Sequence, residues 1–318
     1  MRALVTGAAG FVGQWMCREL LQRGWDVTGT IFGDLPTGAL DPDERRLVRW
    51  VPTDLRRPDQ LRDAVDVAAP DAIVHLAGVA FVPAATADPG SAFEVNTVVA
   101  VRLLGEVRAR LAAGTLDPAV LVVGTGEQYG RHDDSEMPLP ESAEQRPLSV
   151  YAASKAAQEI AALEAWRTSG VRVVCTRSFN HSGPGQASSF LLPSLVARAL
   201  AARAACQPTL SLGNTTPVRD FLHVADVVRA YALLVEKGAP GEVFNVASGR
   251  GTDVAALAAR VLAAARVDAT LQIDSALVRS ADVPVLIGDP SKLESATGWA
   301  PEHSLDSLID ELVRAASS

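Results

Sequence analysis

Features of secreted, membrane-spanning and nucleic-acid-binding proteins are scarce in this sequence. Three cysteines occur among 318 residues, Cys17, Cys175 and Cys206, and their wide spacing predicts neither a disulfide framework nor a metal site. Every apolar run is cut by a charged residue, glycine or proline before about 18 residues, which predicts no membrane span. Lysine and arginine number 29 against 37 aspartates and glutamates, and the net charge of -8 disfavours a nucleic-acid groove. We therefore expect a cytoplasmic protein without an export signal.

Strand-like and helix-like segments alternate through the first half of the chain. The segments are, in order, residues 2–6, 11–23, 25–31, 47–52, 58–68, 72–76, 91–111 and 119–124. The strand-like segments contain continuous apolar runs, such as Val120 to Val123, which are typical of strands buried on both faces. Such alternation predicts a parallel sheet with right-handed crossovers and helices on both of its faces.

A glycine-rich turn between the first strand and the first helix is suited to bind a pyrophosphate. Gly7, Gly10 and Gly13 have the spacing G-x-x-G-x-x-G, with Phe11 and Val12 between the last two. Small residues at such a turn leave the backbone N–H groups of the helix N-terminus open to phosphate oxygens. The general fingerprint is G-x-G-x-x-G, so a simple tight turn stays an alternative. The motif predicts a site for NAD(H) or NADP(H).

Further cofactor contacts are expected at the ends of the later strands. The second strand ends at Ile31 and Phe32, without the carboxylate that binds the ribose of NAD or the arginine that binds the phosphate of NADP. Asp54, followed by Leu55, is a candidate to bind the adenine, with a turn or helix cap as the alternative. Small residues that can pass beside a cofactor follow the fourth strand, namely Leu76, Ala77 and Gly78.

The length and the change of pattern predict two lobes. At about 150 residues per domain, 318 residues correspond to about two domains. The regular alternation ends near Arg177, after which prolines separate shorter segments. We predict an α/β protein with a Rossmann-type doubly wound parallel sheet and a smaller C-terminal α/β lobe. The sheet domain is expected to span residues 1–178 and to include 217–247, and the smaller lobe to span 179–216 and 248–318.

A second candidate site combines a tyrosine and a lysine with the end of a strand. Tyr151 and Lys155 are four residues apart in a helix-like segment, so they share one face. An ammonium near a phenol lowers the phenol pKa, which makes Tyr151 a usable proton donor or acceptor. This spacing also arises by chance, so a structural role is the alternative. It gains support from Thr125 at the end of a strand, a candidate to bind a substrate oxygen, and from Glu127, a candidate acid or base.

Eight short motifs stand out along the chain. They are TGAAGFVG from Thr6, LAG from Leu76, GTGEQYG from Gly124, YAASK from Tyr151, RSFNHSGPGQ from Arg177, VRDF from Val218, RSADVP from Arg279 and TGWAP from Thr297. The first four, in this order, resemble the extended short-chain dehydrogenase/reductases that modify nucleotide sugars. The last four are similar to the GDP-mannose branch of that family, which comprises the GDP-mannose 4,6-dehydratases and the shorter GDP-6-deoxy-4-keto-D-mannose reductases. The resemblance covers the whole chain.

The resemblance implies roles for further residues. It makes the tyrosine, lysine and threonine named above the catalytic group, and it makes Asn180 a substrate contact. It also makes Arg219 and Arg279 ligands of the nucleotide diphosphate, and planar guanidinium groups bind phosphate oxygens in a bidentate way. The alternative for each arginine is a structural ion pair. Related enzymes pair through the helices that correspond to residues 91–111 and 150–168, so a homodimer with a nucleotide-sugar-binding lobe is expected.

The activity that the resemblance implies is reduction of the C4 ketone of a GDP-linked 4-keto-6-deoxy sugar by hydride from NADPH or NADH. A length of 318 residues suits the shorter reductases. A GDP-mannose 4,6-dehydratase is the alternative, because Glu127 can act as its acid or base, although Gly126 stands where the dehydratases carry a hydroxyl. A nucleotide-sugar 4-epimerase is the next alternative. Such an enzyme usually needs a ribose-binding carboxylate, which is absent at Ile31. A cofactor-sensing Rossmann protein without catalysis is the last alternative.

Overall fold

A parallel sheet of seven strands forms the centre of the molecule. The computed structural model describes residues 1–36, 38–274 and 283–317. The strands are β1 (Arg2–Thr6), β2 (Asp26–Ile31), β3 (Arg49–Pro52), β4 (Ala72–His75), β5 (Ala119–Thr125), β6 (Val173–Ser178) and β10 (Val243–Val246). They lie in the order β10, β6, β5, β4, β1, β2 and β3, and every neighbouring pair is parallel. The strand order reverses at β1, and ligands bind at the carboxyl ends of the strands near such a reversal.

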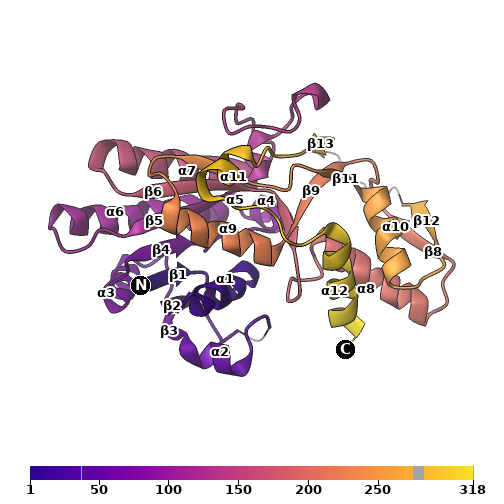
Figure 1. Ribbon diagram of the computed structural model, residues 1–318, viewed down its shortest axis with the longest axis horizontal. Coiled ribbons are helices and arrows are strands. Elements are labelled where there is room, and N and C mark those ends of the chain that lie inside the picture. Colours follow the sequence, from indigo (N-terminus) through magenta and orange to yellow (C-terminus); the bar gives the residue numbers. More distant parts are fainter. Residues whose placement is uncertain (37, 275–282, 318) are drawn as a thin grey trace.

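Helices cover both faces of this sheet (Figure 1). They are α1 (Phe11–Gln22), α2 (Pro42–Leu47), α3 (Pro58–Ala68), α4 (Val82–Ala87), α5 (Pro89–Phe93), α6 (Val99–Ala112), α7 (Val150–Ser169), α9 (Val224–Lys237) and α11 (Ser291–Thr297), with short turns η1 (Glu94–Val98), η2 (Gly126–Tyr129) and η3 (Asp134–Glu136). Successive strand residues point to opposite faces. Val5 and Val74 therefore pack with α1 and α9, whereas Leu4 and Ile73 pack with α3, α6 and α7.

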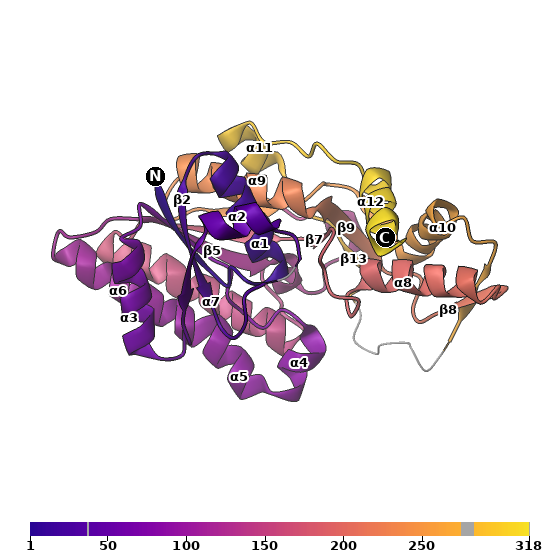
Figure 2. The same ribbon diagram turned by 90° about the horizontal axis from the view of Figure 1, so that it is seen from below.

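A smaller lobe lies at one end of the sheet, as Figures 1 and 2 show. It contains α8 (Leu191–Ala204), α10 (Val254–Ala264) and α12 (Leu305–Ser317), with β7 (Asn180–Ser182), β8 (Thr209–Leu212), β9 (Val218–His223), β11 (Gly251–Asp253), β12 (Thr270–Ile273) and β13 (Val285–Leu286). β9 is the centre of a small sheet that pairs with β7, β11 and β13, and β8 pairs with β12. The lobe has its own apolar core, to which Leu195, Val261 and Leu308 contribute one residue from each long helix.

The expected segments agree with most of the elements, do not include the short helices α2 and α4, and differ at two boundaries. The helix expected over 91–111 is divided, because α5 ends at Phe93, η1 is a turn of π-helix and α6 begins only at Val99. The strand expected over 47–52 begins at Arg49, because a capping box at Asp41 starts α2 before it. Both differences concern boundaries and leave the order of the elements unchanged.

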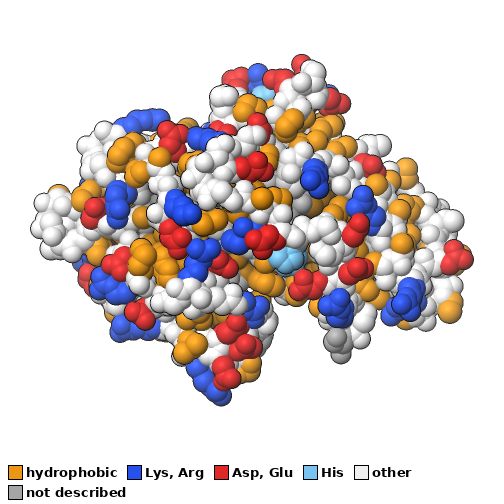
Figure 3. All heavy atoms as spheres, in the orientation of Figure 1, with side chains coloured by type: hydrophobic (Ala, Val, Ile, Leu, Met, Phe, Trp, Pro, Cys, Tyr) orange, Lys and Arg blue, Asp and Glu red, His pale blue; other side chains and the backbone are white. Residues whose placement is uncertain are grey.

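The surface carries charges of both signs. Lysine and arginine side chains lie interspersed with aspartate and glutamate on the face drawn in Figure 3. Within the described ranges, no helix is long and apolar enough to cross a membrane. The three cysteines are free thiols, with Cys17 and Cys175 buried and Cys206 exposed.

Candidate active site

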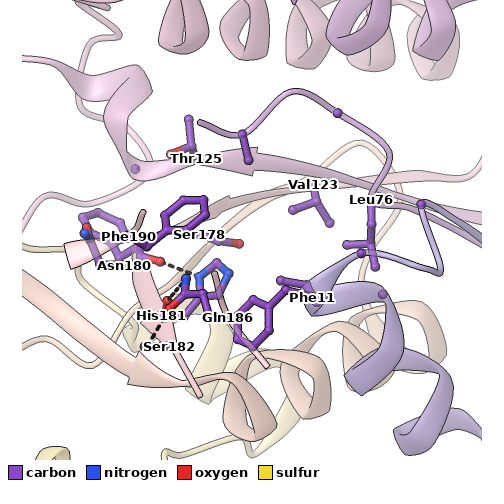
Figure 4. A pocket seen from close by; sticks show the side chains of 18 of the residues that line it. Phe11, Leu76, Val123, Thr125, Ser178, Asn180, His181, Ser182, Gln186 and Phe190 are labelled. Atoms are coloured by element: carbon purple, nitrogen blue, oxygen red, sulfur yellow. Dashed lines mark hydrogen bonds between the residues drawn. The ribbon is translucent and has the colours of Figure 1, made fainter. Parts of the chain in front are cut away.

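A cavity of about 560 Å³ lies at the carboxyl edge of the sheet, against the smaller lobe. Figure 4 shows Phe11 and Leu76 from the sheet side at one end of it, and Asn180 and Phe190 from the smaller lobe at the other. The predicted site residues that line this cavity are Gly7, Gly10, Phe11, Val12, Gly13, Leu76, Gly78, Thr125, Glu127, Tyr151, Lys155 and Asn180. Residues far apart in the sequence meet here because parallel strands bring their carboxyl ends to one edge.

The turn between β1 and α1 leaves no room for side chains. Gly7 has a φ of +69°, a left-handed conformation that glycine adopts without strain. A Cβ atom on Gly13 would lie 2.2 Å from the Gly7 carbonyl oxygen and 2.7 Å from the Ala8 Cα, so only glycine fits. The N-cap of α1 is Gly10, which has no side chain to occupy the first N–H groups of the helix. These residues fit a cofactor pyrophosphate, whose oxygens the N–H groups would hold.

The residues expected to contact the adenine do not lie in the cavity with the other predicted cofactor residues. Asp54 and Leu55 lie outside the lining of the cavity. Asp54 forms a salt bridge of 2.8 Å with the Arg56 guanidinium, and hydrogen bonding to Arg56 lowers the pKa of the Asp54 carboxyl. The Arg56 guanidinium in turn lies 5.4 Å from the centre of the exposed Phe32 ring. A neighbouring arginine thus holds the carboxylate, and the adenine contact stays a prediction.

Asn96 connects the loop after β4 to the helix that carries Tyr151. Its Oδ1 accepts a hydrogen bond from the Val79 N–H at 2.7 Å, and its Nδ2 donates to the Ser154 hydroxyl at 2.9 Å. A Cβ atom on Gly78 would lie 2.8 Å from the same Oδ1, so this loop passes η1 too closely for a side chain. Ala77, expected as a cofactor contact, lies outside the cavity lining.

Thr125, Glu127 and Tyr151 meet at the end of β5. Thr125 caps η2, and its hydroxyl oxygen accepts a hydrogen bond from the Glu127 N–H at 3.3 Å. The Tyr151 phenol, from the first turn of α7, lies beside the Thr125 hydroxyl and near the Glu127 carboxylate. Burial and the negative charge of Glu127 raise the pKa of Tyr151, although the Thr125 hydroxyl acts against them. The phenol therefore keeps its proton at pH 7.

Lys155 lies one helical turn beyond Tyr151. Its Nζ donates to the Val123 carbonyl oxygen at 2.8 Å and to Gln158 Oε1 at 2.8 Å. Burial lowers the pKa of Lys155 to about 8. The sequence predicts that this ammonium lowers the Tyr151 pKa, and that expectation is wrong for this structure. The ammonium is bound to the β5 backbone and to Gln158, while burial and the Glu127 carboxylate raise the phenol pKa.

A buried network that sequence reasoning missed supports these groups. The Glu159 carboxylate accepts from Arg177 Nη2 at 2.7 Å, from Arg177 Nε at 2.9 Å and from Gln128 Nε2 at 2.9 Å. Gln128 Oε1 accepts from the Thr125 N–H at 2.8 Å. The network thus joins α7 and β6 to the end of β5. Glu159 follows the tyrosine and the lysine at the same spacing of four residues, and this repeat was the available signal.

The expected substrate ligands lie on the side of the smaller lobe. Asn180 lines the cavity from β7. Arg219 in β9 pairs in register with Leu286 and shares a strand face with Phe221, and both of these neighbours line the cavity. Arg219 itself does not line the cavity, but these two neighbours on the same face of the small sheet do. Arg279 lies outside the described residues. The described part of the chain contains no group of three or more His, Cys, Asp and Glu side chains placed to hold a metal ion.

Two aromatic pairs connect the sheet side of the cavity with the smaller lobe. Phe11 and His181 are stacked, with ring centres 6.5 Å apart. Phe81, from the loop after β4, meets Phe190 edge to face at 5.8 Å. The His181 Nδ1–H donates to the Phe179 carbonyl oxygen at 2.9 Å, which leaves the other ring nitrogen as an acceptor in the neutral imidazole.

Comparison with known proteins matches almost the whole chain. A model of the family described as GDP-mannose 4,6 dehydratase matches residues 4–312. A GDP-6-deoxy-D-mannose reductase from Pseudomonas aeruginosa is 34% identical over 96% of this chain and 93% of that protein. A GDP-6-deoxy-D-talose 4-dehydrogenase from Aggregatibacter actinomycetemcomitans is 30% identical over 94% of this chain and 92% of that protein.

Solved structures give the same picture. RMD from Pseudomonas aeruginosa, complexed with NADPH, has a TM-score of 0.83 and 30% identity, and the match covers 99% of each chain. UDP-glucose 4-epimerase from Thermotoga maritima, with UDP-glucose, has a TM-score of 0.88 and 25% identity over 99% of this chain and 98% of that chain. The predicted fold class, a Rossmann-type parallel sheet with a smaller C-terminal lobe, is confirmed by these likenesses and by the strand order.

Proposed function

Because this chain belongs to the GDP-mannose 4,6-dehydratase family, within the NAD(P)-dependent extended short-chain dehydrogenase/reductases, we propose that it reduces the C4 ketone of a GDP-linked 4-keto-6-deoxy sugar. The observation that carries the proposal is that Thr125, Tyr151 and Lys155 line the same cavity as the glycine-rich turn. The relative named GDP-6-deoxy-D-mannose reductase supports the choice of substrate.

The residues are placed to supply the proton that this reduction requires. When NADPH or NADH is bound, its nicotinamide supplies the hydride that reaches the ketone carbon. Tyr151 then donates its phenolic proton to the ketone oxygen, which becomes the new hydroxyl. The Thr125 hydroxyl, beside Tyr151 in the cavity, is placed to orient the oxygen that is being protonated. The phenol is neutral at pH 7, so its proton is available to the ketone oxygen.

The smaller lobe is proposed to hold the nucleotide sugar. Asn180 is expected to contact the substrate from within the cavity, and Arg219, next to two residues that line it, to bind the diphosphate. Arg279 is proposed as the second diphosphate ligand on the basis of its motif alone. The proposed division of the chain places residues 1–178 and 217–247 in the cofactor-binding domain and 179–216 and 248–318 in the substrate lobe. β9, which carries Arg219, is the part of 217–247 that pairs with strands of the smaller lobe instead.

A GDP-mannose 4,6-dehydratase is the second candidate, and a specific observation favours it. The Glu127 carboxylate lines the cavity beside Tyr151, where an acid or base for removal of the C6 hydroxyl would have to act. Such an enzyme returns the hydride to its own substrate, so it consumes no reduced cofactor overall. The two candidates can therefore be distinguished by whether NADPH is consumed.

The experiment supplies purified protein with GDP-mannose in one reaction, and with GDP-4-keto-6-deoxymannose plus NADPH or NADH in another. Oxidation of the cofactor at 340 nm in the second reaction supports the reductase. Loss of GDP-mannose in the first, with formation of a 4-keto sugar, supports the dehydratase. Absence of both reactions, while NADPH binds, would point to a cofactor sensor. The variant Tyr151→Phe serves as the control, because it should abolish either reaction and leave cofactor binding intact.

We also propose that the protein is a cytoplasmic homodimer. Val98, Val101 and Ile160 are exposed apolar side chains on η1, α6 and α7, the region through which related enzymes were expected to pair. The free thiols of Cys17 and Cys175 suit a reducing compartment. Light scattering on a size-exclusion column tests the dimer, and Ile160→Asp should shift it towards the monomer.

A further inference from the structure

We propose that Gln158 is a positioning residue that fixes the Lys155 side chain and keeps it protonated for the reaction. This inference rests on the proposed function for its chemistry, although its test does not require a known substrate. Gln158 was not among the residues expected from the sequence. It lies on α7, three residues beyond Lys155, so both side chains lie on one face of the helix.

The hydrogen bond between the two side chains can form in one direction only, from Lys155 to Gln158. Lys155 Nζ donates to Gln158 Oε1 at 2.8 Å and to the Val123 carbonyl oxygen at 2.8 Å. An ammonium group has three N–H donors and no acceptor, so the amide of Gln158 has to present its oxygen to it. Lys155 also lines the cavity, and its third N–H is the one that can reach a ligand there. Gln158 and Val123 thus set the direction of that third donor.

Only the oxygen of the Gln158 amide takes part in this contact. Its Nε2 is a buried donor without a hydrogen-bond partner in the described part of the chain. Leaving a buried donor unpaired is unfavourable, and leucine or methionine would fill a similar volume without it. Packing alone therefore does not explain a glutamine at this position, whereas the hydrogen bond of its oxygen to Lys155 does.

The surroundings of Lys155 make its protonation depend on this oxygen. The titratable groups that face it or its tyrosine are His75 from β4, Tyr151 from α7, Glu127 from η2 and Tyr231 from α9. Burial and the nearby Lys155 lower the pKa of His75 to about 3, so this imidazole is neutral. Burial brings the pKa of Lys155 to about 8, close to neutral pH. Removal or charging of one acceptor therefore moves the titration of Lys155 within the range that can be measured.

The experiment measures the affinity for NADPH by its fluorescence between pH 6.5 and 10 in the wild type, in three variants of Gln158 and in one control variant. The anionic cofactor should bind more weakly as Lys155 loses its proton, with a midpoint near pH 8 in the wild type. Gln158→Leu and Gln158→Met remove the acceptor and should move this midpoint down by about one pH unit. Gln158→Glu places a carboxylate at the same position and should move it up by about one pH unit.

Opposite shifts are the signature of a positioning role, since simple damage to the fold would move all variants alike. Thr97→Val is the matched control, because Thr97 donates to the Ser154 carbonyl oxygen of the same helix at 2.8 Å without contacting Lys155. Its midpoint should stay with the wild type. One variant without the acceptor, Leu or Met, and the Glu variant are together sufficient, because their expected shifts are opposite.

An unchanged midpoint in a folded variant, or shifts of one sign in all of them, would overturn the role of Gln158. Failure of the proposed function gives a different result. In that case the protein turns over none of the GDP-linked sugars, while the opposite shifts in cofactor binding persist. Normal turnover with unmoved midpoints contradicts the inference about Gln158 alone.

Discussion

Arg177 and Glu159 form a bidentate ion pair behind the candidate active site, with Nη2 to Oε1 at 2.7 Å and Nε to Oε2 at 2.9 Å. Their side chains are only 6% and 4% exposed, so water screens the pair little. Because Glu159 lies on the helix of Tyr151 and also binds Gln128, the pair fixes α7 relative to β6 and η2. Breaking it should disturb the fold and the site together.

The variant Arg177→Met should lower the free energy of unfolding by about 3 to 5 kcal/mol, because it leaves the Glu159 carboxylate buried without a counter-charge. Urea denaturation followed by circular dichroism measures the change. Arg108→Met is the matched control: Arg108 pairs with Glu164 at 2.8 Å, but both side chains are exposed and the expected loss is below about 1 kcal/mol. Equal losses in the two variants would contradict the role assigned to the buried pair.

The variant Tyr151→Phe should reduce kcat by about 10² to 10⁴, because the ketone oxygen loses its proton donor. Affinity for NADPH should change little, since the phenyl ring still fills the same space. Thr125→Val should give a smaller loss in kcat, as it removes a hydrogen bond and no proton. Initial rates of NADPH oxidation and fluorescence titration measure the two quantities, and a fully active Tyr151→Phe protein would exclude Tyr151 as the donor.

Turnover should depend on pH through Lys155. Burial holds its pKa at about 8, so the ammonium is the main form at pH 7 and is lost as the pH rises through about 8. The rate should therefore fall on the alkaline side, while Tyr151, with its raised pKa, stays neutral over the same range. Initial rates between pH 6.5 and 9.5 test this. In Lys155→Arg, whose guanidinium does not titrate there, the alkaline fall should disappear.

The variant Gly13→Ala should weaken NADPH binding at least about tenfold and destabilise the fold, because its Cβ would lie 2.2 Å from the Gly7 carbonyl oxygen. Gly105→Ala is the control. Gly105 lies in α6, where an added Cβ would meet no atom within 4 Å, so alanine there should stabilise the helix by about 0.5 to 1 kcal/mol. Thermal unfolding with and without NADPH measures both, and normal binding by Gly13→Ala would contradict the pyrophosphate site.

The variant Arg219→Glu should raise the KM for the nucleotide sugar at least about tenfold, because a carboxylate repels the diphosphate that the arginine is proposed to bind. The Kd for NADPH should stay within about twofold, since Arg219 lies in β9, away from the glycine-rich turn. Steady-state kinetics and fluorescence titration separate the two. A similar loss of affinity for both ligands would place Arg219 in a general structural role.

The sheet and its cofactor edge could be predicted because their signals are local. Gly7, Gly10 and Gly13 lie within one turn, and the strands before and after them are short apolar runs. The family, the enzyme class and the fold class predicted on such motifs are confirmed. The predicted individual roles of the site residues stay predictions until variants are measured.

The remainder depends on contacts between distant parts of the chain, which no local pattern encodes. The Tyr151 pKa is raised because other elements bury the phenol and because Glu127, in η2 after β5, lies near it. Asp54 is a separate case: its partner Arg56 is only two residues away, but the sequence pattern did not decide between a cofactor contact and this ion pair. The small sheet around β9 combines strands from four separate stretches of the chain, so the order of its strands could not be predicted from the sequence either.

The edge-to-face contact of Phe81 with Phe190 joins the two lobes beside the cavity. Such a contact is worth about 0.5 to 1.5 kcal/mol beyond the area that it buries, which is only about one to three times the thermal energy. It therefore contributes only a small part of the free energy that holds the two lobes together beside the cavity.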